Sequence, residues 1–191
     1  DQLVSPGAQW VVSYDPATGD ELWRVEHGPG FSLVARPVFD GTHVFVCTGY
    51  GGKTRLLAIR PDGQGDVTDT HVTWEVDRQV PVMPSPILVG DLLMTIQDGG
   101  VAFCRDRTTG DEHWRKRVGG KYSASPVAVG GMVYFSSQDG VTTVIKAHER
   151  YEQLAVNQLD GKLMASPVPI DEGLLLRTDQ ALYLISDNTD H

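Results

Sequence analysis

The feature that most restricts the fold is a four-residue pattern that occurs four times: alanine or proline, then serine or arginine, then proline, then an aliphatic residue. It stands at Ala35-Arg36-Pro37-Val38, Pro84-Ser85-Pro86-Ile87, Ala124-Ser125-Pro126-Val127 and Ala165-Ser166-Pro167-Val168. The prolines are 49, 40 and 41 residues apart, and tryptophan recurs with spacings of 51 and 40 at Trp23, Trp74 and Trp114. Two unrelated markers that share one period indicate a repeat protein built from a single supersecondary unit.

Each repeat reads as four short strands joined by tight turns. In the clearest unit, the Ser-Pro run that starts at Ser125 is followed by strand-like runs at 132–137, 141–147 and 152–157, with Gly130-Gly131 and Asp139-Gly140 between them. No window supports an amphipathic helix of useful length. Four antiparallel strands at this period predict an all-β fold, a β-propeller in which each repeat forms one blade.

The repeats divide the 191 residues into about 4.5 blades of a single propeller domain. The expected units are an incomplete blade at 1–30, full blades at 31–82, 83–122 and 123–163, and an incomplete last blade at 164–187. The first unit has no predicted first strand, and the last has no fourth. We therefore expect the C-terminal half of a larger ring, whose uncovered blade faces and strand edges favour self-association.

The composition narrows the possible partners. The formal net charge is −9, which argues against a nucleic-acid partner because no basic surface offsets phosphate repulsion. No apolar run has the length of a membrane span. Cys47 and Cys104 stand in apolar, strand-like runs of different repeats, so we expect buried thiols, with a disulfide or a metal pair as the alternative.

Two segments share the pattern Asp-x-x-Thr-Gly-Asp-Glu-x-Trp. Its residues are Asp15, Thr18, Gly19 and Trp23 in the first copy, and Asp106, Thr109, Gly110 and Trp114 in the second. The aspartate can accept N–H groups of a turn, the glycine can adopt a positive φ, and the indole can fill the space between blades. Trp74 keeps the same place after a longer turn, and Leu154 is expected at this place in the next unit.

This pattern resembles the tryptophan-docking motif of the PQQ-like, quinoprotein-type β-propellers, and within them the bacterial BamB-like group. The resemblance covers essentially the full chain, through the repeat length, the Ser-Pro-aliphatic strands and the Asp-Gly turn at Asp139-Gly140. It implies an extracytoplasmic setting (periplasm or cell envelope) and a non-enzymatic scaffold that binds a protein or peptide without a cofactor. The alternative that it implies is a fragment of a quinoprotein-like dehydrogenase that binds PQQ and calcium at the channel mouth.

No catalytic group can be assigned from the sequence. A Ser-His-Asp arrangement, a His-x-x-x-His spacing and a Cys-Cys pair are all missing. The long turn at 60–70 carries Asp62, Asp66 and Asp69, whose oxygens are the ligand type that calcium prefers. Their spacing does not match a complete calcium loop, so we expect a solvated turn and keep the metal site as a weak alternative.

A set of polar residues is expected to converge at one end of the blades, because the connections between blades and the turns between second and third strands open on the same side. The set consists of Arg36, Ser85, Ser125 and Ser166 at the strand starts, and of Tyr50, Lys53, Asp98, Gln138, Asp139, Arg177 and Asp179 in the turns. A propeller would hold a ligand or peptide at such a place. Strand capping and ordinary hairpin chemistry are the alternative roles. Carbohydrate binding, a third possible function, rests on Tyr50 and Tyr122.

Overall fold

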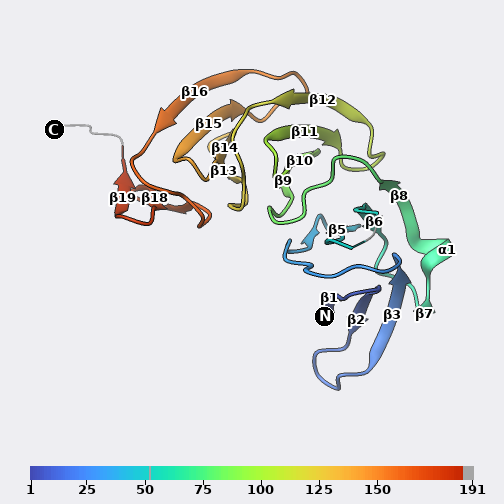
Figure 1. Ribbon diagram of the computed structural model, residues 1–191. Coiled ribbons are helices and arrows are strands. Elements are labelled where there is room, and N and C mark those ends of the chain that lie inside the picture. Colours follow the sequence, from blue (N-terminus) through green and yellow to red (C-terminus); the bar gives the residue numbers. More distant parts are fainter. Residues whose placement is uncertain (52, 187–191) are drawn as a thin grey trace.

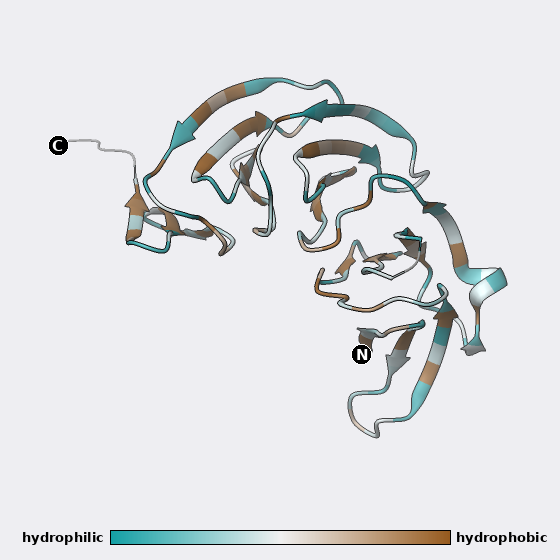
Figure 2. Cartoon of the chain, in the orientation of Figure 1, coloured by the Kyte–Doolittle hydropathy of each residue, from teal (hydrophilic) through white to brown (hydrophobic). Residues whose placement is uncertain are grey.

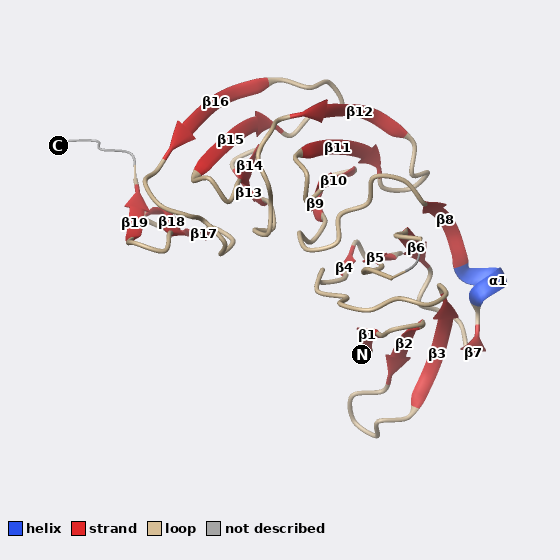
Figure 3. Ribbon diagram, in the orientation of Figure 1, coloured by secondary structure: helices blue, strands red, loops and turns tan. Residues whose placement is uncertain are grey.

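Residues 1–51 and 53–186 form five β-sheets that stand side by side along an arc, and in each sheet the strand that comes first in the sequence lies toward the concave side (Figure 1). The computed structural model describes residues 1–51 and 53–186. Within these ranges the regular structure is nearly all strand, and the one helix, α1 (Thr68–His71), has four residues (Figure 3). The predicted all-β, partial propeller is confirmed.

Three of the sheets have four strands in consecutive antiparallel pairing. The second sheet contains β4 (Val38–Phe39), β5 (Val44–Cys47), β6 (Leu56–Ile59) and β8 (Val72–Val76), and the third contains β9 (Ile87–Val89), β10 (Leu92–Ile96), β11 (Val101–Asp106) and β12 (Glu112–Arg117). The fourth contains β13 (Val127–Val129), β14 (Met132–Ser136), β15 (Val141–Lys146) and β16 (Gln153–Gln158). The fifth sheet has three strands, β17 (Val168–Ile170), β18 (Gly173–Arg177) and β19 (Leu182–Ile185).

The hairpins follow from the glycines between the strands. Val129 pairs with Met132 across Gly130-Gly131, whose φ values are 58° and 76°. Two consecutive positive φ values produce the turn whose twist matches that of antiparallel strands. The short β13 and β14 are therefore held in register by their connection.

The apolar core lies in the seams between neighbouring sheets, where brown segments face one another in Figure 2. Met94 and Ile96 of the third sheet pack with Phe135 and Ile145 of the fourth, and all four side chains are fully buried. Each sheet thus removes apolar surface of its neighbour from water, as expected for a repeat architecture.

Both cysteines are buried and free, which confirms the expectation of buried thiols. Burial raises the pKa of Cys47 and of Cys104 to about 12. A thiol with such a pKa is almost wholly protonated at neutral pH and is a weak nucleophile.

The first sheet differs from the prediction. It contains β1 (Leu3–Pro6), β2 (Trp10–Tyr14) and β3 (Glu21–Glu26), and its fourth strand is β7 (Gly65–Asp66), which pairs parallel with β3. This strand comes from the long turn at 60–70, which is therefore more than a solvated turn. Val67, which follows β7, is 3% exposed and packs with the core between the first two sheets. The long turn crosses the seam and fastens the first blade to the second.

The expectation for Leu154 also needs correction. Trp114 lies opposite Cys104, and the strand carries a bulge just before it, between Glu112 and Trp114. In the fourth sheet Ala155, and not Leu154, is the first paired residue after the same bulge, where it faces Val144. Leu154 occupies the bulge and is 45% exposed.

The fifth sheet has no fourth strand among the described residues, as predicted for the last unit; residue 187 of that unit lies outside the described ranges. One face of this sheet carries exposed aliphatic side chains. They are Val168, Ile170, Leu182 and Leu184.

Candidate functional site: the channel face of the blades

Two seam tryptophans, Trp74 and Trp114, connect their outer strands to the next blade, whereas Trp23 donates its indole N–H to the Gln2 side chain at 2.9 Å within the first sheet's own segment. Trp74 of β8 donates its indole N–H to the carbonyl oxygen of Arg107 at 3.2 Å, and Trp114 of β12 donates to that of His148 at 3.0 Å. Gly110 adopts a φ of 78°, and a Cβ atom there would lie 2.7 Å from the Trp74 ring. The turn at 106–111 therefore accepts the indole of the preceding blade only with glycine at this point.

The first copy of the pattern forms the same turn. Gly19 has a φ of 79°, and the Asp15 carboxylate accepts the N–H of Ala17 at 2.8 Å, as that of Asp106 accepts the N–H of Thr108 at 2.8 Å. In the described part of the chain nothing lies within 4 Å of a Cβ placed on Gly19. The two turns thus share a conformation and differ in whether an indole covers them.

The serines at the strand starts join the blades to one another. The hydroxyl oxygen of Ser85 accepts the N–H of Arg36 at 2.8 Å, that of Ser125 accepts the N–H of Ser85 at 3.0 Å, and that of Ser166 accepts the N–H of Ser125 at 2.9 Å. We call these three contacts the inter-blade serine bonds. Each serine hydroxyl therefore accepts a hydrogen bond from a backbone N–H group of the preceding blade.

These strand starts surround a hollow of about 760 Å³ on the concave side of the arc. Its lining consists of Arg36, Pro37, Val38, Phe39, Ser85, Pro86, Ile87, Leu88, Ser125, Pro126, Val127, Ser166 and Pro167. Calcium needs several oxygen ligands, usually with carboxylates among them. In the described ranges this lining contains no carboxylate, amide or indole side chain, and binding of PQQ with calcium stays an untested alternative.

Two carboxylates among the turn residues of the predicted set already bind backbone N–H groups. The Asp98 carboxylate accepts the N–H groups of Val82 and Met83 at 2.8 and 3.1 Å, and that of Asp179 accepts the N–H of Lys162 at 2.7 Å. These carboxylates hold the connections that lead into the third and fifth blades. Hydrogen bonds of this kind satisfy the acceptor oxygens of a carboxylate, so these oxygens are less available to an external ligand.

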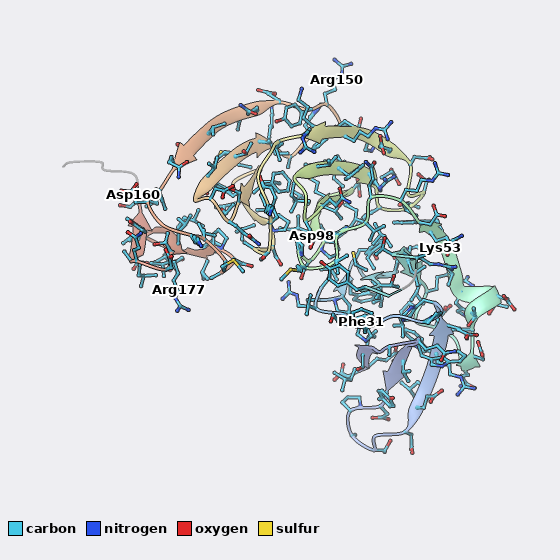
Figure 4. All side chains as sticks on the ribbon, in the orientation of Figure 1. Phe31, Lys53, Asp98, Arg150, Asp160 and Arg177 are labelled. Carbon is cyan, nitrogen blue, oxygen red and sulfur yellow. The ribbon has the colours of Figure 1, made fainter. Side chains whose placement is uncertain are left out.

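The other turn residues have different surroundings. Gln138 donates its amide N–H to the Ser123 hydroxyl at 2.6 Å. Tyr50 stacks on Phe31 with the ring centroids 6.2 Å apart. The exposed residues of the predicted set are Arg36, Tyr50, Lys53, Asp139, Ser166, Arg177 and Asp179. Figure 4 shows Phe31, Asp98 and Arg177 toward the concave side, with Arg150 at the outer margin. Ligand binding by any of these residues stays a prediction.

Two minor candidates have other contacts. Tyr122 is 2% exposed, and burial raises its pKa to about 12, so it cannot stack on a sugar. Asp66 accepts hydrogen bonds from Thr68, which lower the pKa of the carboxyl, whereas Asp62 lies 3.4 Å from His71. Across the described ranges no three His, Cys, Asp or Glu side chains, these aspartates and Asp69 included, gather in a way that could hold a metal ion.

The predicted set does not include a row of exposed apolar residues, which lies beside the Arg-Pro and Ser-Pro strand starts. Val34, Met83 and Met164 each stand two residues before an Arg-Pro or Ser-Pro pair, and they are 59%, 38% and 54% exposed. Ser123 takes this place in the remaining repeat, and its hydroxyl lies 3.8 Å from the Met83 sulfur. Extending the repeat alignment by two residues would have found them. We call Val34, Met83, Ser123 and Met164 the channel-mouth row.

The sequence profile of the family described as outer membrane protein assembly factor BamB matches residues 7–65 and 66–164. The chain belongs to this family. The crystal structure of BamB from Moraxella catarrhalis superposes with a TM-score of 0.52 at 13% identity, over 95% of this chain and 68% of that one. Since the identity is low, this BamB structure supports the fold alone. No curated protein sequence matches. No helix in the described ranges is long and apolar enough to span a membrane.

Proposed function

We propose that the chain is a non-enzymatic propeller scaffold that binds a protein partner at the channel mouth. The observation that carries this proposal is the channel-mouth row, which exposes Val34, Met83 and Met164 at repeat-equivalent positions. Flexible thioether side chains adapt their shape to an apolar surface and occur often at protein-binding sites. Exposed apolar residues that recur at one face favour a docking surface over chance exposure.

The neighbouring polar groups support the same surface. Lys121 and Lys162 line a shallow hollow together with Met164, Gln138 and Asp139. In the part of the chain that the structure describes, neither lysine forms an ion pair, so both can pair with carboxylates of a partner. We infer a partner segment with apolar side chains flanked by acidic ones.

The family description supports the setting. It names the assembly of outer membrane proteins, so we propose that the partner belongs to that process and that the chain works outside the cytoplasm. Self-association is a further proposal, because the fifth sheet exposes Val168, Leu182 and Leu184 on one face.

The experiment uses a photo-crosslinking amino acid at positions 83 and 164, with position 154 as the control. Leu154 has an exposed fraction of 45%, similar to those of Met83 and Met164, but it lies on the outer strand β16. We expect one common crosslinked protein at 83 and 164 and not at 154. The affinity of that purified protein should then fall at least about tenfold in Met83→Asp/Met164→Asp, which corresponds to about 1.4 kcal/mol, and remain unchanged in Leu154→Asp.

Two outcomes would contradict the proposal. One is crosslinking at 154 alone, or equally at all three positions. The other is saturable thermal stabilisation of the chain by PQQ with calcium, accompanied by dye reduction with an alcohol or sugar, which would favour the quinoprotein alternative. A crosslink from one copy of the chain to another at 83 and 164 would identify the channel mouth as a self-association surface.

A further inference from the structure

The first sheet shows which sequence can pair with the outer strand of a blade. Its outer strand β3 contains Trp23 and Arg24, and β7 pairs with β3 in parallel, so that Gly65 lies opposite Trp23 and Asp66 lies opposite Arg24. The Nε atom of Arg24 lies 3.9 Å from a carboxylate oxygen of Asp66. The outer edge of β3 thus accepts a glycine followed by an acidic residue.

The residues that follow β7 continue along the same edge. Val67 donates its N–H to the carbonyl oxygen of Arg24 at 2.9 Å, and the hydroxyl oxygen of Thr68 accepts the N–H of Glu26 at 2.8 Å. Arg24 and Glu26 are two residues apart, as expected for the outward-facing backbone groups of an edge strand. The added segment therefore covers the edge of β3 over four residues, 65–68.

The outer strand of the third blade repeats the features of β3. The pair Trp-Arg occurs twice in the chain, at Trp23-Arg24 of β3 and at Trp114-Arg115 of β12, and each tryptophan follows a bulge. Each arginine lies beside a glutamate three residues earlier, Arg24 at 3.7 Å from Glu21 and Arg115 at 3.6 Å from Glu112. Unlike β3, β12 is the edge of its sheet, at the convex margin of the arc (Figure 1).

The edge of β12 is open because the fourth blade has a short turn. The segment that covers β3 belongs to the turn at 60–71, between the third and fourth strands of the following blade. The corresponding turn beside β12 is at 147–152, and it provides no strand in the described ranges. It contacts Trp114 through the His148 carbonyl oxygen and through Tyr151, whose ring centroid lies 5.2 Å from that of the indole. These contacts cover the tryptophan and leave the residues after it exposed.

The backbone of β12 presents two residues outward. Val118 donates its N–H to the carbonyl oxygen of Gly100 on the neighbouring chain segment at 2.9 Å. Alternate residues of an antiparallel strand bond to the paired strand, and the residues between them direct their N–H and C=O groups away from it. Arg115 and Arg117 are therefore the residues whose backbone groups are available to an added strand.

The side chains at this edge are basic. Arg115, Lys116 and Arg117 follow one another and are exposed, in a chain whose formal net charge is −9. In the described ranges no carboxylate lies within ion-pair distance of Lys116 or Arg117. Arg117 has the position that Glu26 has in β3, so the residue beside it should be acidic, where β3 is joined by Thr68. The Lys116 ammonium lies 5.4 Å from the Tyr151 ring centroid, so the residue opposite Lys116 needs no charge.

We propose that β12 binds an extended segment of a partner protein with the order glycine, acidic residue, uncharged residue, acidic residue, which adds to β12 as a parallel strand. The first acidic side chain pairs with Arg115 and the second with Arg117. A second copy of β12 does not fit this edge, because two basic strands repel each other. The inference goes beyond the proposed function, since β12 is an outer strand and not part of the channel-mouth row.

The first test uses fluorescently labelled peptides, blocked at both ends, and fluorescence anisotropy on the full chain. The first peptide has the order Ser-Gly-Asp-Val-Asp-Ser, the second has asparagine in place of both aspartates, and the third has the scrambled order Ser-Val-Asp-Asp-Gly-Ser with the same charge. We expect the first peptide to bind at least about tenfold more tightly than the asparagine peptide and about threefold more tightly than the scrambled one.

The second test measures amide hydrogen exchange by NMR. Binding of the first peptide at saturation should slow exchange of the Arg115 and Arg117 amides at least about fivefold, because these amides then donate to the added strand. The Lys116 amide faces β11 and should not change. Attraction between charges alone would not produce this alternation.

Variants at exposed positions provide the controls. In Arg115→Gln/Arg117→Gln we expect the preference for the acidic peptide to disappear while the asparagine peptide keeps its affinity. Arg150→Gln removes another exposed cation at the outer margin (Figure 4) and should leave the preference unchanged. Equal binding of the three peptides, an unchanged preference in the double variant, or unslowed exchange at both arginine amides would overturn the proposal and leave the cations as mere guards of the edge. Partner crosslinking at positions 83 and 164 is measured separately, so either proposal can fail alone.

Discussion

Replacing Gly110 by alanine tests whether the indole contact stabilises the seam between the second and third blades. The new methyl group would lie 2.7 Å from the Trp74 ring and would also force alanine into a φ of 78°. The backbone strain costs about 1–2 kcal/mol. Displacement of a packed ring costs about 1–3 kcal/mol more. We expect Gly110→Ala to lower the free energy of unfolding by about 4 kcal/mol.

Gly19→Ala is the matched control, because the same turn has a φ of 79° with nothing within 4 Å of the added atom in the described ranges. It carries the strain without the collision, so we expect a loss of about 1–2 kcal/mol. The difference between the two variants, about 2 kcal/mol, isolates the contact between the glycine and the indole.

A third comparison removes the ring. In a Trp74→Ala background, Gly110→Ala should cost no more than Gly19→Ala, because no indole remains to be displaced. All variants are measured by urea unfolding followed by circular dichroism. Equal losses in Gly110→Ala and Gly19→Ala, or a Gly110→Ala loss that persists without Trp74, would refute the contribution of this contact.

Two further predictions concern the blade seams and pH. Ser125→Ala removes the acceptor of the Ser85 N–H and should cost about 1–3 kcal/mol, with faster hydrogen exchange at the Ser85 amide than at other seam amides; unchanged exchange there would contradict the inter-blade serine bonds. Burial lowers the pKa of His27 below its ordinary 6.5, so the unfolded chain binds this proton more readily and stability should fall as the pH drops through 6.5. His27→Gln should make the unfolding free energy less dependent on pH between about 7 and 5, and an equal dependence would exclude His27 as the cause.

The period of the sequence was sufficient to predict the antiparallel blades, because within a blade each strand pairs with the next strand of that blade and each hairpin carries its own turn residues. The contacts between blades were harder to predict. The pairing of Gly65 with Trp23 joins two residues that are far apart in sequence, and nothing local distinguishes Gly65-Asp66 from a solvated turn. Likewise, a bulge gives Ala155 the position in the fourth sheet that Trp114 has in the third, and this bulge depends on strand register rather than on residue type.

The candidate site was predicted only in outline. Polarity placed Ser85 and Asp98 among the ligand candidates, but both are engaged by backbone atoms of neighbouring connections. Polar residues at a turn can serve the fold or a ligand, and the sequence does not distinguish the two uses. Met83 and Met164 were not predicted for the opposite reason, because an apolar residue near a strand start is usually expected to be buried in the core.

Because of the segment that carries β7 and Val67, we expect the sheets at the two ends of the arc to differ in their resistance to unfolding. The first blade is tied to the second by a strand and a buried side chain from that blade, whereas in the described ranges the buried residues of the small cluster against the last sheet are Ala124, Leu163 and Leu176. Under rising denaturant or a pulling force, β17–β19 should detach first and leave the other four sheets assembled. Loss of order would then travel along the arc in one direction, from the C-terminal end.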